Sequence, residues 1–187
     1  MTTAITEKTP LIIIDMQVGF DEPYWGKRNN PNAESNIQLL LNSWRLKKRP
    51  VIHVKHCSLE EKSPLREDSK GNDFKPEVTP IENELIIKKF VNSAFIGTEL
   101  ETYLKDNNYE TLVIVGLTTD HCISTTTRMA GNFGFSPILV SDATATFDRT
   151  GPNGIVYKAQ KIHDIHLASL NNEFCEVCTT KLIMNQG

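Results

Sequence analysis

The stretch TLVIVGLTTDHC (111–122) decides the fold class of this sequence. Its first part, 111–117, is almost entirely apolar and rich in β-branched residues, which predicts a buried strand. Such a near-continuous apolar strand is typical of a parallel sheet that is covered on both faces. A small polar turn, 118–120, follows the strand, and Cys122 then lies at the start of a predicted helix.

The same alternation of short apolar runs and longer amphipathic stretches continues in both directions from this segment. The other predicted strands are 11–15, 51–56, 85–89, 137–143 and a last one at 177–183. The predicted helices are 33–47, 97–108, 120–132 and 155–170, and a polar loop rich in proline covers 57–80. Strands that alternate with helices predict an α/β fold with a mostly parallel sheet.

The composition indicates a folded chain that forms a single domain over residues 1–187. Of the 187 residues, 39% are hydrophobic and 23% are charged, so the chain can bury a core. The formal charge of −3 and the lack of a basic patch argue against nucleic-acid binding. The apolar runs are too short to cross a membrane, and residues 1–10 lack the apolar core of a signal peptide. With four cysteines and no disulfide framework, we expect a cytoplasmic protein with reduced thiols.

Polar side chains end three of the predicted strands. Asp15 ends the first strand, Lys88 and Lys89 end the third, and Cys122 follows the fourth. In an open parallel sheet these ends meet at one edge, where ligands bind. The N-terminus of a helix and a nearby lysine ammonium both stabilise the negative charge of a thiolate. A nearby carboxylate can accept the proton that the thiol gives up. An aspartate, a lysine and a cysteine together therefore predict an activated nucleophile.

Three motifs resemble those of the isochorismatase-like cysteine hydrolases. They are IDMQ (14–17), KKFVNSAFIGTEL (88–100) and GLTTDHCIS (116–124), and the resemblance runs from about residue 10 to about residue 181. It implies a three-layer, Rossmann-like sandwich in which a six-stranded, mostly parallel sheet carries helices on both faces. This agrees with the fold class that the periodicity predicts.

The resemblance also implies roles for single residues. Asp15 matches the general base and acid of the family, and Cys122 matches its nucleophile. Lys89 matches the catalytic lysine because it precedes Ser93 by four residues, a spacing that Lys88 does not fit. The backbone amides of Thr118 and Cys122 would form the oxyanion hole, in a loop where the family holds a cis peptide bond, here Leu117–Thr118.

The resemblance predicts no bound metal and no cofactor. Metal-containing nicotinamidases of the family carry an Asp-x-His pair near the end of the second strand, where this sequence has His56-Cys57-Ser58. Cys175-x-x-Cys178 has the spacing of half a zinc site, but the regular apolar pattern around it favours two buried thiols and leaves their role open.

Other residues near the predicted site receive weaker assignments. Phe20 and Trp25 follow the strand that bears Asp15 and could form a wall of the substrate pocket, and His56 could line it. Asp142, at the end of another strand, is expected to hold the nucleophile loop in shape.

Three functions remain open at this point. The first is a metal-independent hydrolase that cleaves a carbon–nitrogen bond in a small amide, ureide or lactam. The second is isochorismatase proper, which cleaves a vinyl ether without a thiol and often has glycine in place of Cys122. The third is a non-catalytic binding protein on the same fold. The intact cysteine favours the first function. The sequence does not name the substrate.

The resemblance also suggests a homo-oligomer, either a dimer or a tetramer.

Overall fold

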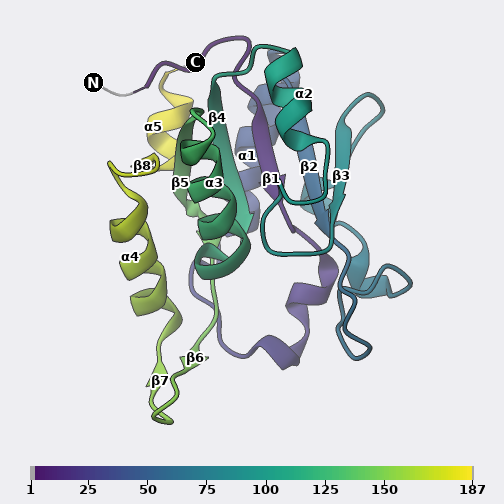
Figure 1. The fold of residues 1–187 in the computed structure, drawn as a ribbon, viewed down its shortest axis with the longest axis vertical. Helices are drawn as coiled ribbons and strands as arrows, with labels where there is room; N and C mark the ends of the chain where they lie inside the picture. The colour runs from purple at the N-terminus through teal and green to yellow at the C-terminus, as the bar shows by residue number, and fades with distance from the viewer. Residues whose placement is uncertain (1–2, 187) are drawn as a thin grey trace.

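The computed structural model describes residues 3–186. Its strands are β1 (Leu11–Ile14), β2 (Val51–His56), β3 (Leu85–Lys89), β4 (Thr111–Leu117), β5 (Ser136–Ala145), β6 (Arg149–Thr150), β7 (Val156–Tyr157) and β8 (Glu176–Cys178). Its α-helices are α1 (Ala33–Leu46), α2 (Leu100–Asp106), α3 (Ser124–Asn132), α4 (Ala159–Leu170) and α5 (Thr180–Met184). Figure 1 shows the strands of the sheet side by side, with α2 and α3 in front of them and α1 behind, and with the β6–β7 hairpin extending away from the sheet.

Six strands form one sheet in the order β3-β2-β1-β4-β5-β8, and every neighbouring pair is parallel. The predicted fold class is confirmed. The chain builds the sheet outward from β1 in one direction and then from β4 in the other, so the strand order reverses between these two strands. In such sheets ligands bind beyond the carboxyl ends of the strands at this reversal.

The side chains of β1 show how the sheet divides the core into two layers. Leu11 and Ile13 pack into a cluster with residues of α1 and α5, whereas Ile12 and Ile14 pack into a second cluster with residues of α2 and α3. All four are fully buried. Successive side chains of a strand point to opposite faces, so a strand covered on both sides has to be apolar throughout.

Two predicted elements are wrong in part. The segment 177–183 was expected to be one strand, but β8 ends at Cys178 and α5 begins at Thr180 after a helix cap by the Thr179 hydroxyl. The predicted helix 155–170 begins only at Ala159, because residues 156–157 pair with β6 instead. Among residues 3–186, no helix is long and apolar enough to cross a membrane.

Gly116 allows β4 to lie against β1 at the strand reversal. It pairs with Ile14 and has a φ of +123°, which favours glycine. A Cβ atom at this position would lie 2.0 Å from the carbonyl oxygen of Ile14. The nearest atoms are all backbone atoms of Ile14 in the central strand β1, so they cannot move aside without disturbing the sheet.

We therefore expect Gly116→Ala to lower the free energy of unfolding by about 3 kcal/mol or more, through the added overlap and the unfavourable φ. Gly154→Ala is the matched control, because Gly154 has a φ of +76° but open space around it. This control should lose only about 1 kcal/mol. Urea denaturation of both variants checks the prediction, and equal losses would contradict it.

Candidate active site

Asp15, Lys89 and Cys122 come together beyond the carboxyl ends of three strands. Asp15 follows β1, Lys89 is the last residue of β3, and Cys122 lies in a π-helical turn (Thr119–Ile123) after β4. The Nζ atom of Lys89 donates hydrogen bonds to Oδ2 of Asp15 at 2.7 Å and to Sγ of Cys122 at 3.2 Å. Three segments that are distant in the sequence thus contribute to one cluster.

The backbone around this cluster has two unusual features. The peptide bond Leu117–Thr118 is cis, which confirms the prediction from the resemblance. Asp15 has a φ of +53°, in the left-handed region that aspartate tolerates better than most residues. Both features lie where the chain leaves the strands at the β1–β4 reversal.

The ammonium of Lys89 is the central charge of the cluster. The residue is fully buried, and its Nζ also lies 3.1 Å from Nδ1 of His56, the residue opposite it in β2. Burial opposes the charge, but Asp15 and Cys122 beside it outweigh burial and raise the pKa of Lys89. The lysine is therefore protonated, and Nδ1 of His56 accepts one of its hydrogens. Burial and the Lys89 charge lower the pKa of His56, so its ring is neutral near pH 7.

The thiol of Cys122 is buried beside the carboxylate of Asp15 and the ammonium of Lys89. Burial, and next the negative charge of Asp15, raise its pKa far above the ordinary value, although Lys89 acts in the opposite direction. Cys122 is therefore a protonated thiol beside a carboxylate and not a stable thiolate.

Oδ1 of Asp15 is buried and has no hydrogen-bond partner among the residues that the structure describes. Its other oxygen is held by Lys89, so the free oxygen is available to the thiol or to a ligand. Asp15, Cys122 and His56 have polar atoms within 4.8 Å of one another. A proton released by the thiol has only a short distance to travel to the carboxylate.

A small cavity of about 80 Å³ opens over Cys122. Its lining residues come from the β1, β2, β3 and β4 ends and from the loops that follow: Asp15, Phe20, Trp25, His56, Leu65, Asn92, Thr118, His121 and Cys122. Phe20, Trp25 and His56, which were expected near the substrate, are therefore at the cavity, and their contact with substrate remains a prediction.

Aromatic side chains form one wall of the cavity. The ring centroids of Phe20 and Trp25 are 4.8 Å apart, and both rings also stack with Phe147 from the loop after β5. The indole Nε1 of Trp25 donates to the carbonyl oxygen of Gly19 at 2.7 Å. Because this polar atom is already bonded, the wall presents an apolar surface to the cavity.

Two buried amide side chains join the loops that carry this wall. The side chain of Gln17 accepts from the backbone N–H of His56 and donates to the carbonyl oxygens of His56 and Asn72. Asn72, in the long loop 57–80, donates to the carbonyl oxygens of His56 and Leu65 at 2.8 and 2.7 Å. The long loop is thus fixed against the end of β2 and places Leu65 in the cavity lining.

Sequence reasoning missed three of the lining residues. Asn92 and His121 had a signal, since one follows Lys89 by three residues and the other immediately precedes Cys122. Leu65 had no such signal, because it lies far from every motif. Its position depends on the hydrogen bonds that its carbonyl accepts from Asn72 and Ser58.

Asp15, His56 and Cys122 have the geometry of a possible metal-ligand set. The ammonium of Lys89, however, donates hydrogen bonds to Asp15 and Cys122 and contacts His56. A divalent cation would have to displace this ammonium or lie close beside it, so the donor set does not fit a metal. Cys175 and Cys178 are both buried and pack into two different hydrophobic clusters, and among the described residues they belong to no group of three or more potential metal ligands.

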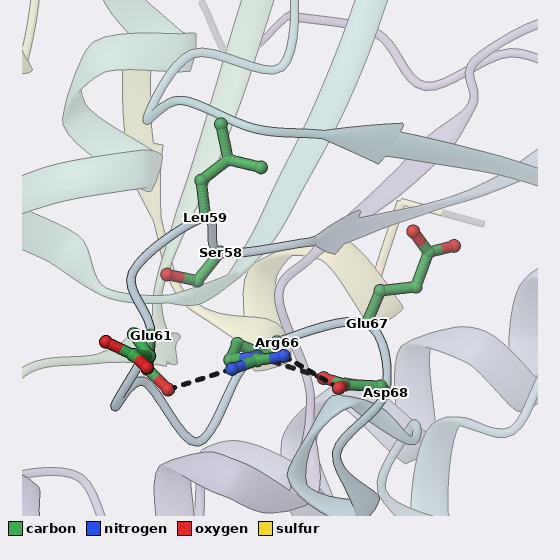
Figure 2. Close-up of a pocket in the computed structure, with 6 residues that line it drawn as sticks. All are labelled: Ser58, Leu59, Glu61, Arg66, Glu67 and Asp68. Carbon is green, nitrogen blue, oxygen red and sulfur yellow. Dashed lines mark hydrogen bonds and ion pairs between the residues drawn. The ribbon is translucent and has the colours of Figure 1, made fainter.

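A larger hollow, of about 680 Å³, lies in the long loop beside the candidate site. Figure 2 shows its lining residues, Ser58, Leu59, Glu61, Arg66, Glu67 and Asp68. The cation among them, Arg66, is already paired with the carboxylate of Asp68 and the carbonyl oxygen of Glu61. The lining of this hollow includes none of Asp15, Lys89 and Cys122. The small cavity over Cys122 therefore remains the better candidate for the active site.

The family model described as "Isochorismatase domain" matches residues 9–181. The chain belongs to the isochorismatase family. The uncharacterized isochorismatase family protein YrdC of Bacillus subtilis is 49% identical over 179 residues, which are 96% of each chain. A putative hydrolase of the family from Chromobacterium violaceum is 41% identical, with a TM-score of 0.95 over 100% of this chain and 98% of that one. N-carbamoylsarcosine amidase of an Arthrobacter species is 36% identical over 75 residues, 40% of this chain and 28% of that protein.

In this isochorismatase-family hydrolase, Asp120 holds the turn that carries Cys122, and the expectation for Asp142 was wrong. Asp142 accepts from the backbone N–H and hydroxyl of Thr180 and so anchors α5. The carboxylate of Asp120, two residues before the cysteine, instead accepts from Arg149 at 2.7 Å and from the hydroxyl of Thr146. Although burial opposes the charge, these hydrogen bonds lower the pKa of Asp120 to about 2.

A carboxylate with a depressed folded-state pKa stabilises the fold above its unfolded pKa, and this contribution is lost as the pH falls through the folded value. We expect Asp120→Asn to lower the free energy of unfolding by about 2 kcal/mol at pH 7. The difference from the wild type should shrink as the pH falls from about 4 to about 2. Urea denaturation across this pH range, with the exposed Asp68→Asn as the control, checks the result. A difference that stays constant with pH would contradict it.

Proposed function

We propose that this protein is a cysteine-dependent hydrolase that cleaves a carbon–nitrogen bond of a small molecule through a thioester on Cys122. One observation carries the proposal. The Lys89 ammonium bridges Asp15 and Cys122 under a small cavity, while the second oxygen of Asp15 remains unbonded among the described residues. A nucleophile, a proton acceptor and a cation that keeps the acceptor charged are thus assembled at one position.

The first step is attack of the sulfur on the substrate carbonyl. Because the thiol is protonated, Asp15 takes its proton as the carbon–sulfur bond forms. Lys89 stays protonated and orients the carboxylate through the 2.7 Å hydrogen bond. The negative charge that develops on the carbonyl oxygen would be stabilised by the backbone amides of Thr118 and Cys122, and losing one such donor typically costs about 3 kcal/mol.

The second step breaks the carbon–nitrogen bond. Asp15 returns its proton to the nitrogen, and the amine leaves a thioester on Cys122. A water molecule then attacks the thioester while the same carboxylate accepts a proton from it. As the carbon–sulfur bond breaks, Asp15 gives this proton to the sulfur, which releases the acid and restores the thiol. The carboxylate thus acts alternately as base and acid, and the ammonium beside it keeps its charge throughout.

The relatives support this reaction class to different degrees. The name of the Arthrobacter relative, N-carbamoylsarcosine amidase, describes carbon–nitrogen cleavage, although the match covers 40% of this chain. The family model carries the name of isochorismatase, a vinyl-ether hydrolase that needs no thiol. The presence of Cys122 against Lys89 and Asp15 favours the amidase reaction, because vinyl-ether cleavage has no use for such a nucleophile.

Trapping the acyl-enzyme tests the proposal. The protein is mixed with a panel of small amides and ureides, ammonia release is measured, and acid-quenched samples are analysed by mass spectrometry. We expect an acyl adduct on the peptide that contains Cys122 and none on the peptide that contains Cys57, another buried thiol near the site. Turnover without any adduct and with full activity in Cys122→Ala would exclude covalent catalysis. No turnover on the whole panel would favour a non-catalytic binding protein.

A further inference from the structure

We infer that the site selects small, uncharged amides with an apolar acyl group and rejects amides whose acyl group carries a carboxylate. This inference rests on the proposed hydrolase function and adds its substrate class. It is drawn from the charges, the unbonded polar atoms and the size of the cavity over Cys122, which are considered in turn.

No cation is available to pair with a carboxylate in the cavity. Among its described lining residues there is no lysine or arginine. The nearby Lys89 is fully buried, and its ammonium is directed at Asp15, Cys122 and His56. Arg149 contacts the turn that carries Cys122, but its guanidinium is already paired with Asp120 of that turn.

The two histidines at the cavity do not supply a positive charge either. His56 accepts from Lys89 at Nδ1, and a second proton on the ring would point at the ammonium. His121 has a side chain that is 52% exposed, and burial of the remainder lowers its pKa although Asp120 acts in the opposite direction. Both rings are therefore predominantly neutral at pH 7, and they can donate or accept hydrogen bonds without adding charge.

The unbonded polar atoms of the cavity suit an amide better than a carboxylate. Oδ1 of Asp15 and Oγ1 of Thr118 are buried without a hydrogen-bond partner in the part of the chain that the structure describes. An amide N–H can donate to the Asp15 oxygen. A carboxylate would instead meet this negative charge in a poorly hydrated space, and no cation among the described lining residues would compensate for its lost hydration.

The size and the wall of the cavity define the acyl group. Its volume of about 80 Å³ is far below the roughly 300–1,000 Å³ of pockets for drug-sized ligands. Phe20, Trp25 and Leu65 form the apolar part of the lining, and the indole N–H of Trp25 is already bonded. A short branched or straight alkyl chain fits this surface, and a charged group has no partner on it.

Two pairs of amides with equal numbers of heavy atoms test the inference. 4-Methylpentanamide is compared with succinamate, and 5-methylhexanamide with glutaramate, so that a carboxylate replaces an isopropyl group. We expect kcat/KM for ammonia release to be at least about tenfold higher for the uncharged member of each pair. The same order is expected for binding to Cys122→Ala, followed by the fluorescence of Trp25.

A variant with a new cation provides an internal check. Asn92 is an exposed lining residue, so Asn92→Arg places a guanidinium at the cavity with little risk to folding, and Asn92→Gln is the matched neutral control. We expect the ratio of the succinamate to the 4-methylpentanamide kcat/KM to rise in Asn92→Arg and to stay near the wild-type ratio in Asn92→Gln. Using the ratio cancels any common effect of the substitution on catalysis.

The outcomes separate this inference from the proposed function. Hydrolysis of the carboxylates through Cys122 at rates equal to or above those of the uncharged amides would overturn the inference and leave the proposed function intact. Preferential binding of the uncharged amides without turnover by the wild type would support the substrate class and argue against the hydrolase function. Absence of saturable binding by the uncharged amides, or tighter binding of the carboxylates to Cys122→Ala, would overturn the inference.

Discussion

Cys122→Ala should lower kcat for the amide substrate by about 10⁴-fold or more. In the proposed mechanism the sulfur forms the covalent bond, so the variant keeps the cavity but has no atom to attack the carbonyl. Substrate binding should change much less than kcat, because the alanine leaves the aromatic wall and Asp15 in place. Steady-state ammonia release, with the KM or a direct binding constant measured separately, distinguishes the two effects.

Cys57→Ala is the control for this experiment. Cys57 is also a buried free thiol, and it lies directly after His56 at the end of β2, but it does not line the cavity. We expect this variant to keep a kcat within a few-fold of the wild type. Equal losses in the two variants would show that the effect of Cys122→Ala arises from damage to the fold, and an unchanged kcat in Cys122→Ala would contradict nucleophilic catalysis.

Lys89→Met should affect both stability and activity. The substitution keeps most of the side-chain volume but leaves the carboxylate of Asp15 buried without its cation. Breaking a fully buried ion pair in this way costs about 3–5 kcal/mol, because the remaining charge is neither hydrated nor paired. We expect the midpoint of urea unfolding to fall accordingly and amide hydrolysis to become undetectable above background, since Asp15 loses the partner that orients it.

Two further variants separate charge from packing in this prediction. Asp15→Asn combined with Lys89→Met removes both charges, and asparagine tolerates the positive φ at position 15. This double variant should recover much of the lost stability but no activity. Lys88→Met, which removes the neighbouring exposed lysine, should leave both close to the wild type. A double variant that is no more stable than Lys89→Met would show that the loss does not come from the unpaired charge.

The strands of the sheet and the three motif residues could be predicted because their signals are local. A fully buried parallel strand has to be apolar at every position, and residues 11–14 and 111–117 show this directly. Polar residues at or just beyond the carboxyl ends of such strands lie at one edge of the sheet. This is why Asp15, Lys89 and Cys122 were predicted to share a site. The choice of Lys89 over Lys88 came from motif spacing, and the structure shows Lys89 buried and Lys88 exposed.

The short elements near the C-terminus could not be predicted in the same way. Residues 176–184 contain too few residues for either periodicity to stand out, so one apolar pattern fitted both a strand and a helix. The division into β8 and α5 depends on the pairing of β8 with β5 and on the helix cap at Thr179. The role of Asp142 was misjudged for a related reason, because its partner Thr180 lies 38 residues away.

By itself, the sequence determined the α/β architecture, the family and the three side chains of the candidate site, since each follows from hydrophobic patterning or from motif spacing. Only the tertiary structure decided the ionisation of Cys122 and the composition of its cavity. The protonation state depends on burial of the thiol and on its distances from the carboxylate of Asp15 and the ammonium of Lys89. The cavity depends on how the long loop is fixed to Gln17 and Asn72, which places Leu65 beside Phe20 and Trp25. Charge and shape at the site arise from segments far apart along the chain, and no local pattern encodes them.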